Sequence, residues 1–156
     1  MDIFTVSLFG HRQSDHLWAL EAQLKASVRR LIESKSCIVF LIGRNGEFDE
    51  YAASVIKQAK REIENENADL TLVLPYRVSN IEYYEKYYDN VVIPDPVHNA
   101  HPKSAILLRN QWMIDRSDLV MVYVERNVGG AYRAMKYAER TGKSIVILGN
   151  KKTADS

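Results

Sequence analysis

The segment CIVFLIGRNGEF, residues 37–48, decides the fold. Its first six residues form an almost unbroken apolar run, which is typical of a parallel strand that has helices packed on both faces. Two glycines and an arginine, Gly43, Arg44 and Gly46, follow at once and end the strand. A helix is predicted over residues 48–64, so the segment holds the strand, the turn and the helix start of one β-α unit.

The same unit recurs along the chain. Apolar runs predict further strands, and apolar residues three and four apart predict further helices. The strands are expected at residues 4–9, 70–74, 119–124 and 144–148, with a short strand-like run at 90–93, and the helices at 15–33, 103–116 and 130–140. Asp15 is expected to cap the first helix, and Gly142 to end the last one in a left-handed conformation.

This order of elements predicts an α/β fold. Right-handed crossovers between successive strands give a Rossmann-like, doubly wound, mainly parallel five-stranded sheet with helices on both faces. The chain has 156 residues, a length that suits one domain, and no linker or repeat divides it. We therefore expect a single domain over residues 1–150 and a polar tail over residues 151–156.

Composition narrows the classes of partner. The chain has 21 Lys plus Arg and 20 Asp plus Glu, and the resulting formal net charge of +1 disfavours nonspecific nucleic-acid binding. The first residues lack a secretion signal, and no apolar run approaches the roughly 20 residues of a membrane helix. A cytoplasmic protein without membrane association is expected. The single cysteine, Cys37, lies in an apolar run and is expected to be an inert core thiol.

Two other clusters of residues, one of histidines and one of tyrosines, can be explained without a bound ligand. His98 and His101 lie among prolines, with no carboxylate or thiol at zinc-like spacing beyond Asp95, so we expect neither a metal nor a cofactor. Four tyrosines at helical spacing are predicted to seal a core edge or a subunit interface. They are Tyr83, Tyr84, Tyr87 and Tyr88. A homo-oligomer, with a dimer favoured, is therefore expected.

Three turns that follow predicted strands carry the candidate site. Their sequences are GHR at residues 10–12, GRNGE at 43–47 and ERNVGG at 125–130. Ligands of open parallel sheets bind beyond the carboxyl ends of the strands, and amides at helix starts attract phosphate. Arg12 and Arg44 can add bidentate contacts to the same anion. The alternative is that these turns only connect strands to helices. His11 is either a structural or ligand-contacting residue or a proton-transfer group.

The predicted helix at residues 103–116 places four residues on one face. Ile106, Arg109, Asn110 and Met113 are three and four residues apart, so they lie along one side of the helix. Arginine and asparagine between apolar neighbours are costly to bury without polar partners. Arg109 and Asn110 therefore contact a ligand or hydrogen-bond the backbone of the protein, and we favour the ligand.

Three motifs resemble the SLOG superfamily of Rossmann-like nucleotide-handling proteins. They are SLFGHR at residues 7–12, IGRNGEFD at 42–49, and RNQWM at 109–113 followed by Ser117, Asp118, Gly129 and Gly130. Within the superfamily the chain is similar to the YpsA-like branch, which is related to the Lonely Guy phosphoribohydrolases and to the DNA-processing protein DprA. The resemblance extends from Thr5 to Leu148.

The resemblance has consequences for activity. Arg109, Met113, Ser117, Asp118, Gly129 and Gly130 match the Lonely Guy pattern, whereas Asn110 replaces its lysine and Tyr132 and Arg133 replace its paired glutamates. Cleavage of an N-glycosidic bond normally needs a carboxylate, so the resemblance supports binding more than turnover. Glu47, Asp49 and Glu125 are the substitute carboxylates, with Arg109 holding the phosphate.

Three functions follow from these features. The first is a module that binds a nucleotide or nucleotide derivative as a sensor or sequestering protein; the second is an N-glycoside hydrolase or transferase acting on a nucleoside monophosphate. The third and weaker hypothesis is a DNA-associated protein in the manner of DprA. The candidate ligand-binding residues are Gly10, His11, Arg12, Gly43, Arg44, Asn45, Gly46, Glu47, Arg109, Asn110, Met113, Glu125, Gly129 and Gly130.

Overall fold

The computed structural model describes residues 2–44 and 46–149. The strands are β1 (Phe4–Gly10), β2 (Ile38–Ile42), β3 (Ala68–Val73), β4 (Asn90–Val92), β5 (Leu119–Tyr123) and β6 (Ser144–Ile147). The helices are α1 (Glu21–Ser34), α2 (Glu47–Ile63), α3 (Ile81–Tyr87), α4 (Pro102–Asp115) and α5 (Gly130–Arg140), with 3-10 turns at Leu17–Leu20 and Asp95–Val97. None of the described helices is both long and apolar enough to span a lipid bilayer. The predicted tail lies outside the described residues.

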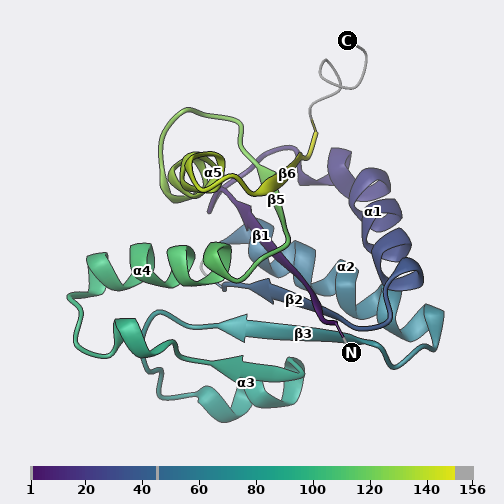
Figure 1. Ribbon diagram of the computed structural model, residues 1–156, viewed down its shortest axis with the longest axis horizontal. Coiled ribbons are helices and arrows are strands. Elements are labelled where there is room, and N and C mark those ends of the chain that lie inside the picture. Colours follow the sequence, from purple (N-terminus) through teal and green to yellow (C-terminus); the bar gives the residue numbers. More distant parts are fainter. Residues whose placement is uncertain (1, 45, 150–156) are drawn as a thin grey trace.

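The strands form one parallel sheet, which confirms the predicted α/β, Rossmann-like class (Figure 1). Within the described residues the sheet has six strands in the order β4-β3-β2-β1-β5-β6. The predicted five-stranded count was one short, because the strand-like run at residues 90–93 joins the sheet as β4. Asn90 and Val91 pair with Thr71 and Leu72 of β3, so even a three-residue strand extends the ladder.

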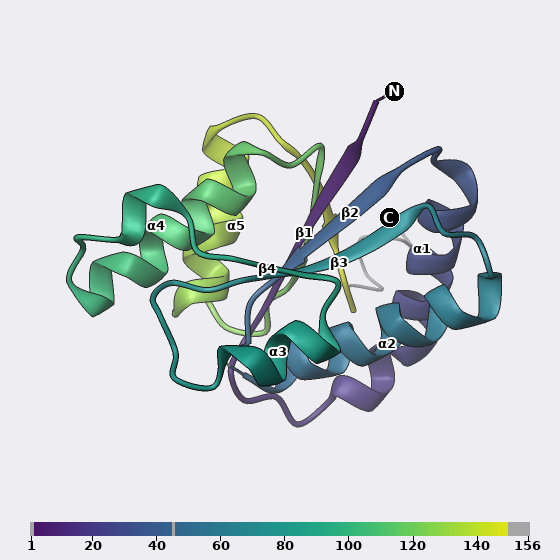
Figure 2. The ribbon, with the colours of Figure 1, turned by 90° about the horizontal axis from the view of Figure 1, so that it is seen from below.

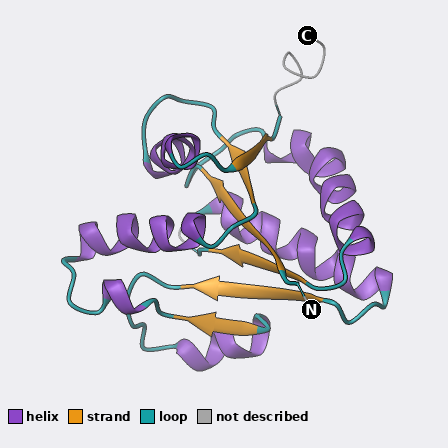
Figure 3. Cartoon of the chain, in the orientation of Figure 1, coloured by secondary structure: helices purple, strands orange, loops and turns teal. Residues whose placement is uncertain are grey.

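Helices cover both faces of the sheet, as Figures 2 and 3 show. Successive residues of a strand point to opposite faces, so each buried strand supplies two cores. Phe40 packs in one cluster with Leu24 of α1 and Ile56 of α2. Its neighbour Leu41 packs in the other cluster with Ala134 of α5 and a buried side chain of α4. This double covering explains why residues 38–42 are apolar throughout.

The chain changes winding direction between β1 and β5. The connections that carry α1 and α2 pack together on one face, and α4 and α5 pack together on the other. Neighbouring strands β1 and β5 therefore send their following loops toward opposite faces, which leaves a crevice at their carboxyl ends. The fold places the candidate site at this crevice.

One local prediction, the start of the first helix, differs from the structure. The first helix was expected from residue 15, but a 3-10 turn at Leu17–Leu20 precedes α1, and no side chain caps either segment. Asp15 is therefore not a helix cap. The four tyrosines at helical spacing lie in α3 and at its end. Their rings contact one another, with Tyr87 and Tyr88 5.0 Å apart between centroids.

Gly142 ends α5 as predicted. Its φ of +73° is in the left-handed region, which glycine adopts without the strain that a Cβ causes. The amide of Lys143 donates to the carbonyl of Ala138, and the amide of Gly142 donates to that of Glu139. This pair of bonds is the Schellman arrangement, which satisfies carbonyls at the helix end.

Candidate functional site

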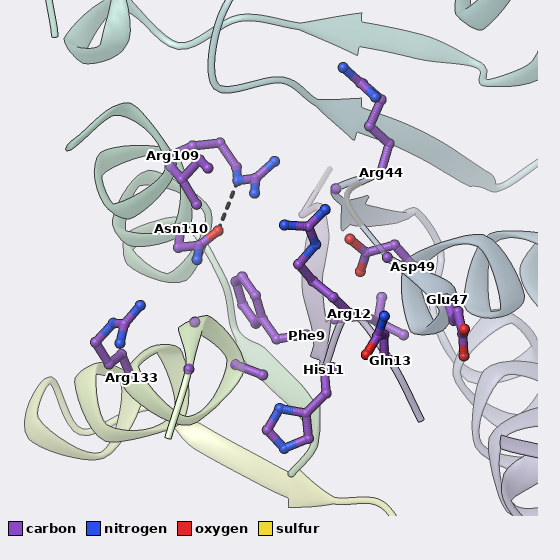
Figure 4. Close-up of a pocket in the computed structure, with 18 of the residues that line it drawn as sticks. Phe9, His11, Arg12, Gln13, Arg44, Glu47, Asp49, Arg109, Asn110 and Arg133 are labelled. Atoms are coloured by element: carbon purple, nitrogen blue, oxygen red, sulfur yellow. Dashed lines mark hydrogen bonds between the residues drawn. The ribbon is translucent and has the colours of Figure 1, made fainter. Parts of the chain in front are cut away.

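A cleft of about 1110 Å³ lies at the carboxyl ends of β1, β2, β3 and β5 and is walled on one side by α4 (Figure 4). All three predicted turns contribute to it. The predicted residues that line it are Gly10, His11, Arg12, Gly43, Arg44, Gly46, Glu47, Asp49, Arg109, Asn110, Gly129 and Gly130. Segments far apart in the sequence therefore meet in one place.

Two predicted residues lie elsewhere. Met113 is fully buried in the core between α4 and the sheet and does not line the cleft. The Glu125 carboxylate accepts a 2.7 Å hydrogen bond from Ser14 Oγ and lies 3.4 Å from His16 Nδ1, outside the cleft lining. Met113 is thus placed in the core, and Glu125 is placed beside Ser14 and His16 rather than among the residues that line the cleft. Asn45 lies outside the described residues.

Cationic side chains dominate the cleft. In the described part of the chain, five arginines and three carboxylates line it. The arginines are Arg12, Arg44, Arg109, Arg126 and Arg133, and the carboxylates are Glu47, Asp49 and Glu50. Guanidinium groups bind phosphates and carboxylates through paired hydrogen bonds, so this lining favours an anionic ligand.

Arg126, Arg133 and Tyr76 are among the lining residues that the sequence argument missed. Arg126 follows Glu125 in a predicted turn. Arg133 lies in the first turn of α5, at a position where the Lonely Guy pattern has a glutamate. Tyr76 follows β3 and exposes 39% of its surface. A signal for Arg126 and Arg133 was present, because both are cationic residues beside the Gly129-Gly130 helix start. For Tyr76 the signal was only its place after a strand.

Arg109 is buried and held by the protein. Its Nη1 donates to the carbonyl of Val73 at 2.8 Å, and its Nε donates to the Asn110 side-chain oxygen at 2.8 Å. Burial lowers the pKa of the Arg109 guanidinium, and the nearby Asp49 carboxylate raises it. Arg109 therefore hydrogen-bonds the backbone of the protein, which was the second of the two alternatives. It also lines the cleft, although only 4% of its surface is exposed.

Arg44 and Arg12 have different orientations. The Arg44 guanidinium lies 5.4 Å from the centre of the Tyr84 ring, and in Figure 4 it points away from Arg12. The Arg12 side chain extends into the middle of the cleft, toward Arg109 and beside Asp49 (Figure 4). We therefore expect Arg12 to contact a bound anion more directly than Arg44.

The two glycine-containing helix starts differ in access. At α2, a Cβ on Gly46 would lie 2.4 Å from the Arg12 Cα, and the Glu47 amide already donates to the Arg12 carbonyl at 2.9 Å. Gly46 therefore serves the close approach of two loops. At α5, no atom lies within 4 Å of a Cβ placed on Gly130. Of these two, the α5 start is the more open at its glycine.

His11 joins two loops of the cleft. Its Nε2 accepts hydrogen bonds from the backbone amides of Glu125 at 2.9 Å and Arg126 at 3.2 Å. Burial lowers the pKa of the His11 imidazole, Arg126 lowers it further, and Glu125 raises it. The side chain is 5% exposed. The imidazole is therefore neutral near pH 7.

The Ser117-Asp118 motif has a structural role. Ser117 Oγ shares a 2.6 Å hydrogen bond with Ser7 Oγ and donates to the carbonyl of Met113 at 2.8 Å. Asp118 accepts a hydrogen bond from the amide of Thr5 at 2.8 Å. These contacts join the end of α4 to β1, below the cleft rather than in it.

Ser117→Ala is expected to lower the free energy of unfolding by about 0.5–1.5 kcal/mol, because it removes a buried hydroxyl that makes two hydrogen bonds. Urea denaturation measures the change. Ser104→Ala, on the exposed first turn of the same helix, is the control and should change the stability by less than about 0.5 kcal/mol. Equal effects of the two changes would contradict the structural role of Ser117.

Comparisons with known proteins support the fold. Neither a protein family nor a curated protein matches the sequence. DNA processing protein A from Helicobacter pylori, described for its single-stranded DNA binding mode, is similar with a TM-score of 0.63 and 15% identity over 92% of this chain and 64% of that one. DprA from Streptococcus pneumoniae has a TM-score of 0.60 and 16% identity over 93% and 50%.

These likenesses confirm the resemblance to DprA at the level of the fold. This chain spans less than two thirds of the length of either DprA chain. The assignment to the YpsA-like branch stays a prediction.

Proposed function

We propose that the chain binds a nucleotide or nucleotide derivative, with a phosphate at the amino end of α5. The open helix start at Gly129-Gly130, in a cleft lined by five of the described arginines, carries this proposal. Free amides and the helix dipole attract phosphate at such a position. Arg133 and Arg126 lie beside it and supply charge-assisted contacts.

The opposite part of the cleft suits the remainder of a nucleotide. Tyr76 lines it with aromatic surface, which a base can cover. Glu47, Asp49 and Glu50 lie at the start of α2, where their oxygens can accept hydrogen bonds from sugar hydroxyls. The cleft thus offers donors to an anionic group and acceptors to sugar hydroxyls.

Binding without turnover is the activity that we propose. Glu125 does not line the cleft, and Glu47 Oε2 accepts a hydrogen bond from the amide of Ser14 at 3.2 Å. Asp49 lines the cleft near Arg109 and is the carboxylate to test first. Incubation of the protein with nucleoside monophosphates, followed by chromatography for the released base, tests for turnover. Release that disappears in Asp49→Asn would favour the hydrolase instead.

Arg133→Gln is expected to weaken nucleotide binding about tenfold or more, because a charge-assisted hydrogen bond contributes about 1.5–3 kcal/mol. Isothermal titration calorimetry with a panel of nucleoside mono- and diphosphates gives the dissociation constants. Arg140→Gln is the control, since Arg140 is exposed in the last turn of the same helix and does not line the cleft. Unchanged affinity in Arg133→Gln would contradict the phosphate position.

A single-stranded oligonucleotide belongs in the same panel, because one DprA of similar fold is described as binding single-stranded DNA. Binding through many phosphates weakens steeply with salt, whereas a single bound phosphate gives a shallow dependence. A nucleotide that binds with a shallow salt dependence supports the proposal. Binding of the oligonucleotide alone would replace it with the DNA hypothesis.

A further inference from the structure

We propose that His11 is a recognition and positioning residue of the cleft: its Nε2 holds the loop after β5 in place, and its Nδ1–H donates a hydrogen bond to an anion at the Gly129 turn. This inference rests on the proposed function, because the anion is the phosphate assigned there.

The hydrogen bonds of Nε2 determine the tautomer. A nitrogen that accepts from two backbone amides, at 2.9 and 3.2 Å, carries no proton. In a neutral imidazole the proton is then on the other nitrogen, Nδ1. The backbone amides of Glu125 and Arg126 therefore make Nδ1 a hydrogen-bond donor.

This donor has no protein partner and reaches the cleft. No hydrogen bond to Nδ1 is found among the described residues, and His11 lines the cleft although only 5% of the residue is exposed. A Cβ placed on Gly129 would lie 4.0 Å from Nδ1, so the nitrogen lies beside the turn that starts α5. A ligand oxygen at this helix start would supply the missing acceptor.

Gly129 keeps the approach to Nδ1 open. Its φ of +93° is in the region that L side chains rarely adopt, so the turn itself selects glycine. Nδ1 lies beside the helix start, 4.0 Å from the position of a Cβ on Gly129. Each offers a donor, which is the arrangement that a phosphate or sulfate oxygen needs.

The same histidine links the loops that form the walls. Ser14 Oγ donates to the Glu125 carboxylate, and Arg126 Nη2 donates to the carbonyl of Gln13 at 3.3 Å. Together with His11, these two side chains join the loop after β1 to the loop after β5. Protonation of Nε2 would turn an acceptor into a donor that faces two amide donors. The loop after β5 would then lose its position, and with it the anion site.

The direction in which anion affinity changes with pH therefore distinguishes this role of His11 from that of a cationic histidine. A histidine that binds an anion as a cation gains affinity as the pH falls, whereas His11 should lose affinity as the pH falls through its lowered pKa. The charged groups around it are Arg126 and Glu125 on the loop after β5, His16 beyond Glu125, Arg12 next in the chain and Arg133 on α5. Their net charge is positive, and it also opposes protonation.

Two substitutions separate the functions of the two nitrogens. Glutamine places an amide oxygen near the position of Nε2, so His11→Gln keeps an acceptor for the loop and removes the Nδ1 donor. Asparagine places an amide nitrogen near the position of Nδ1, so His11→Asn keeps the donor and removes the acceptor. His98→Gln is the control, because His98 is an exposed histidine away from the cleft lining.

The experiment uses sodium sulfate as the probe, because sulfate does not titrate near neutral pH. Amide NMR titrations of Gly129 and Gly130 at constant ionic strength give the affinity, and ¹⁵N shifts of the imidazole give the tautomer of His11. We expect the Nδ1–H tautomer in the free protein and about three- to tenfold weaker sulfate binding in His11→Gln. Affinity should fall as the pH drops below about 6.5, the ordinary histidine pKa, in the wild type and in His98→Gln, and stay level in His11→Gln.

The outcomes distinguish this inference from the proposed function. An Nε2–H tautomer overturns the role of His11 whatever the sulfate result. Wild-type sulfate binding that tightens as the pH falls, or that His11→Gln matches, overturns the inference and leaves the proposed function standing. Absence of sulfate binding in the wild type overturns both. His11→Asn should exchange the amides of Glu125 and Arg126 faster than the wild type, and unchanged exchange contradicts the positioning role.

Discussion

Gly10→Ala is expected to lower the free energy of unfolding by about 1–3 kcal/mol or more, the range found when a packed core receives an added methyl group. A Cβ on Gly10 would lie 2.2 Å from Phe48 Cγ, closer than any packed contact allows. Phe48 cannot turn aside easily, because it is fully buried and its ring lies 6.3 Å from that of Tyr123. Either α2 or the end of β1 must move.

Gly130→Ala is the matched control for this prediction. A Cβ there meets no atom within 4 Å, and alanine favours helix more than glycine does. We expect a stability change of less than about 1 kcal/mol, with a gain as the favoured direction. Urea unfolding followed by circular dichroism measures both variants. A Gly10→Ala variant as stable as Gly130→Ala would contradict the packing of β1 against α2.

Arg109→Met is expected to lower the free energy of unfolding by about 1–3 kcal/mol and to weaken nucleotide binding. Methionine fills much of the volume of the arginine stem but leaves two acceptors unpaired, the Val73 carbonyl and the Asn110 side-chain oxygen. Each unsatisfied buried acceptor costs about 1–3 kcal/mol, partly offset because the desolvation of the guanidinium is also relieved. Loss of the cation should weaken the binding of a nucleotide about tenfold.

Arg116→Met tests whether the effect is specific to the buried position. Arg116 follows the same helix, but it is exposed and stacks 3.8 Å from the Trp112 ring centre. Its substitution should change the stability by less than about 0.5 kcal/mol and leave nucleotide affinity unchanged. Urea unfolding and calorimetry supply the two readouts. Similar results for both arginines would show that Arg109 does not join α4 to the end of β3.

The fold was predictable because its strands are buried on both faces. Residues 38–42 and 119–123 have apolar side chains throughout, and that pattern cannot belong to a surface element. The exception is a short segment whose structure is set by contacts with a neighbouring strand rather than by its own sequence pattern. β4 has three residues and is a strand through its pairing with β3.

The site was predictable as a set of turns but not as a set of side-chain directions. Glu125 and Arg126 are adjacent, yet Glu125 turns toward Ser14 and Arg126 lines the cleft. Arg109 and Met113 share a helix face, but Arg109 reaches the carbonyl end of β3 whereas Met113, one turn later, lies over the sheet. Sequence spacing gives the face of a helix and not the height of each residue relative to the strand ends.

The two edge strands of the sheet are short. In the described part of the chain, β4 has three residues and β6 has four, whereas the inner strands have five to seven. An outer strand offers its unpaired backbone groups to any foreign strand, and a brief one offers few. The long, aggregation-prone runs of this chain are therefore shielded from partners by their own neighbours, and we expect the folded protein to resist fibre-like association at high concentration.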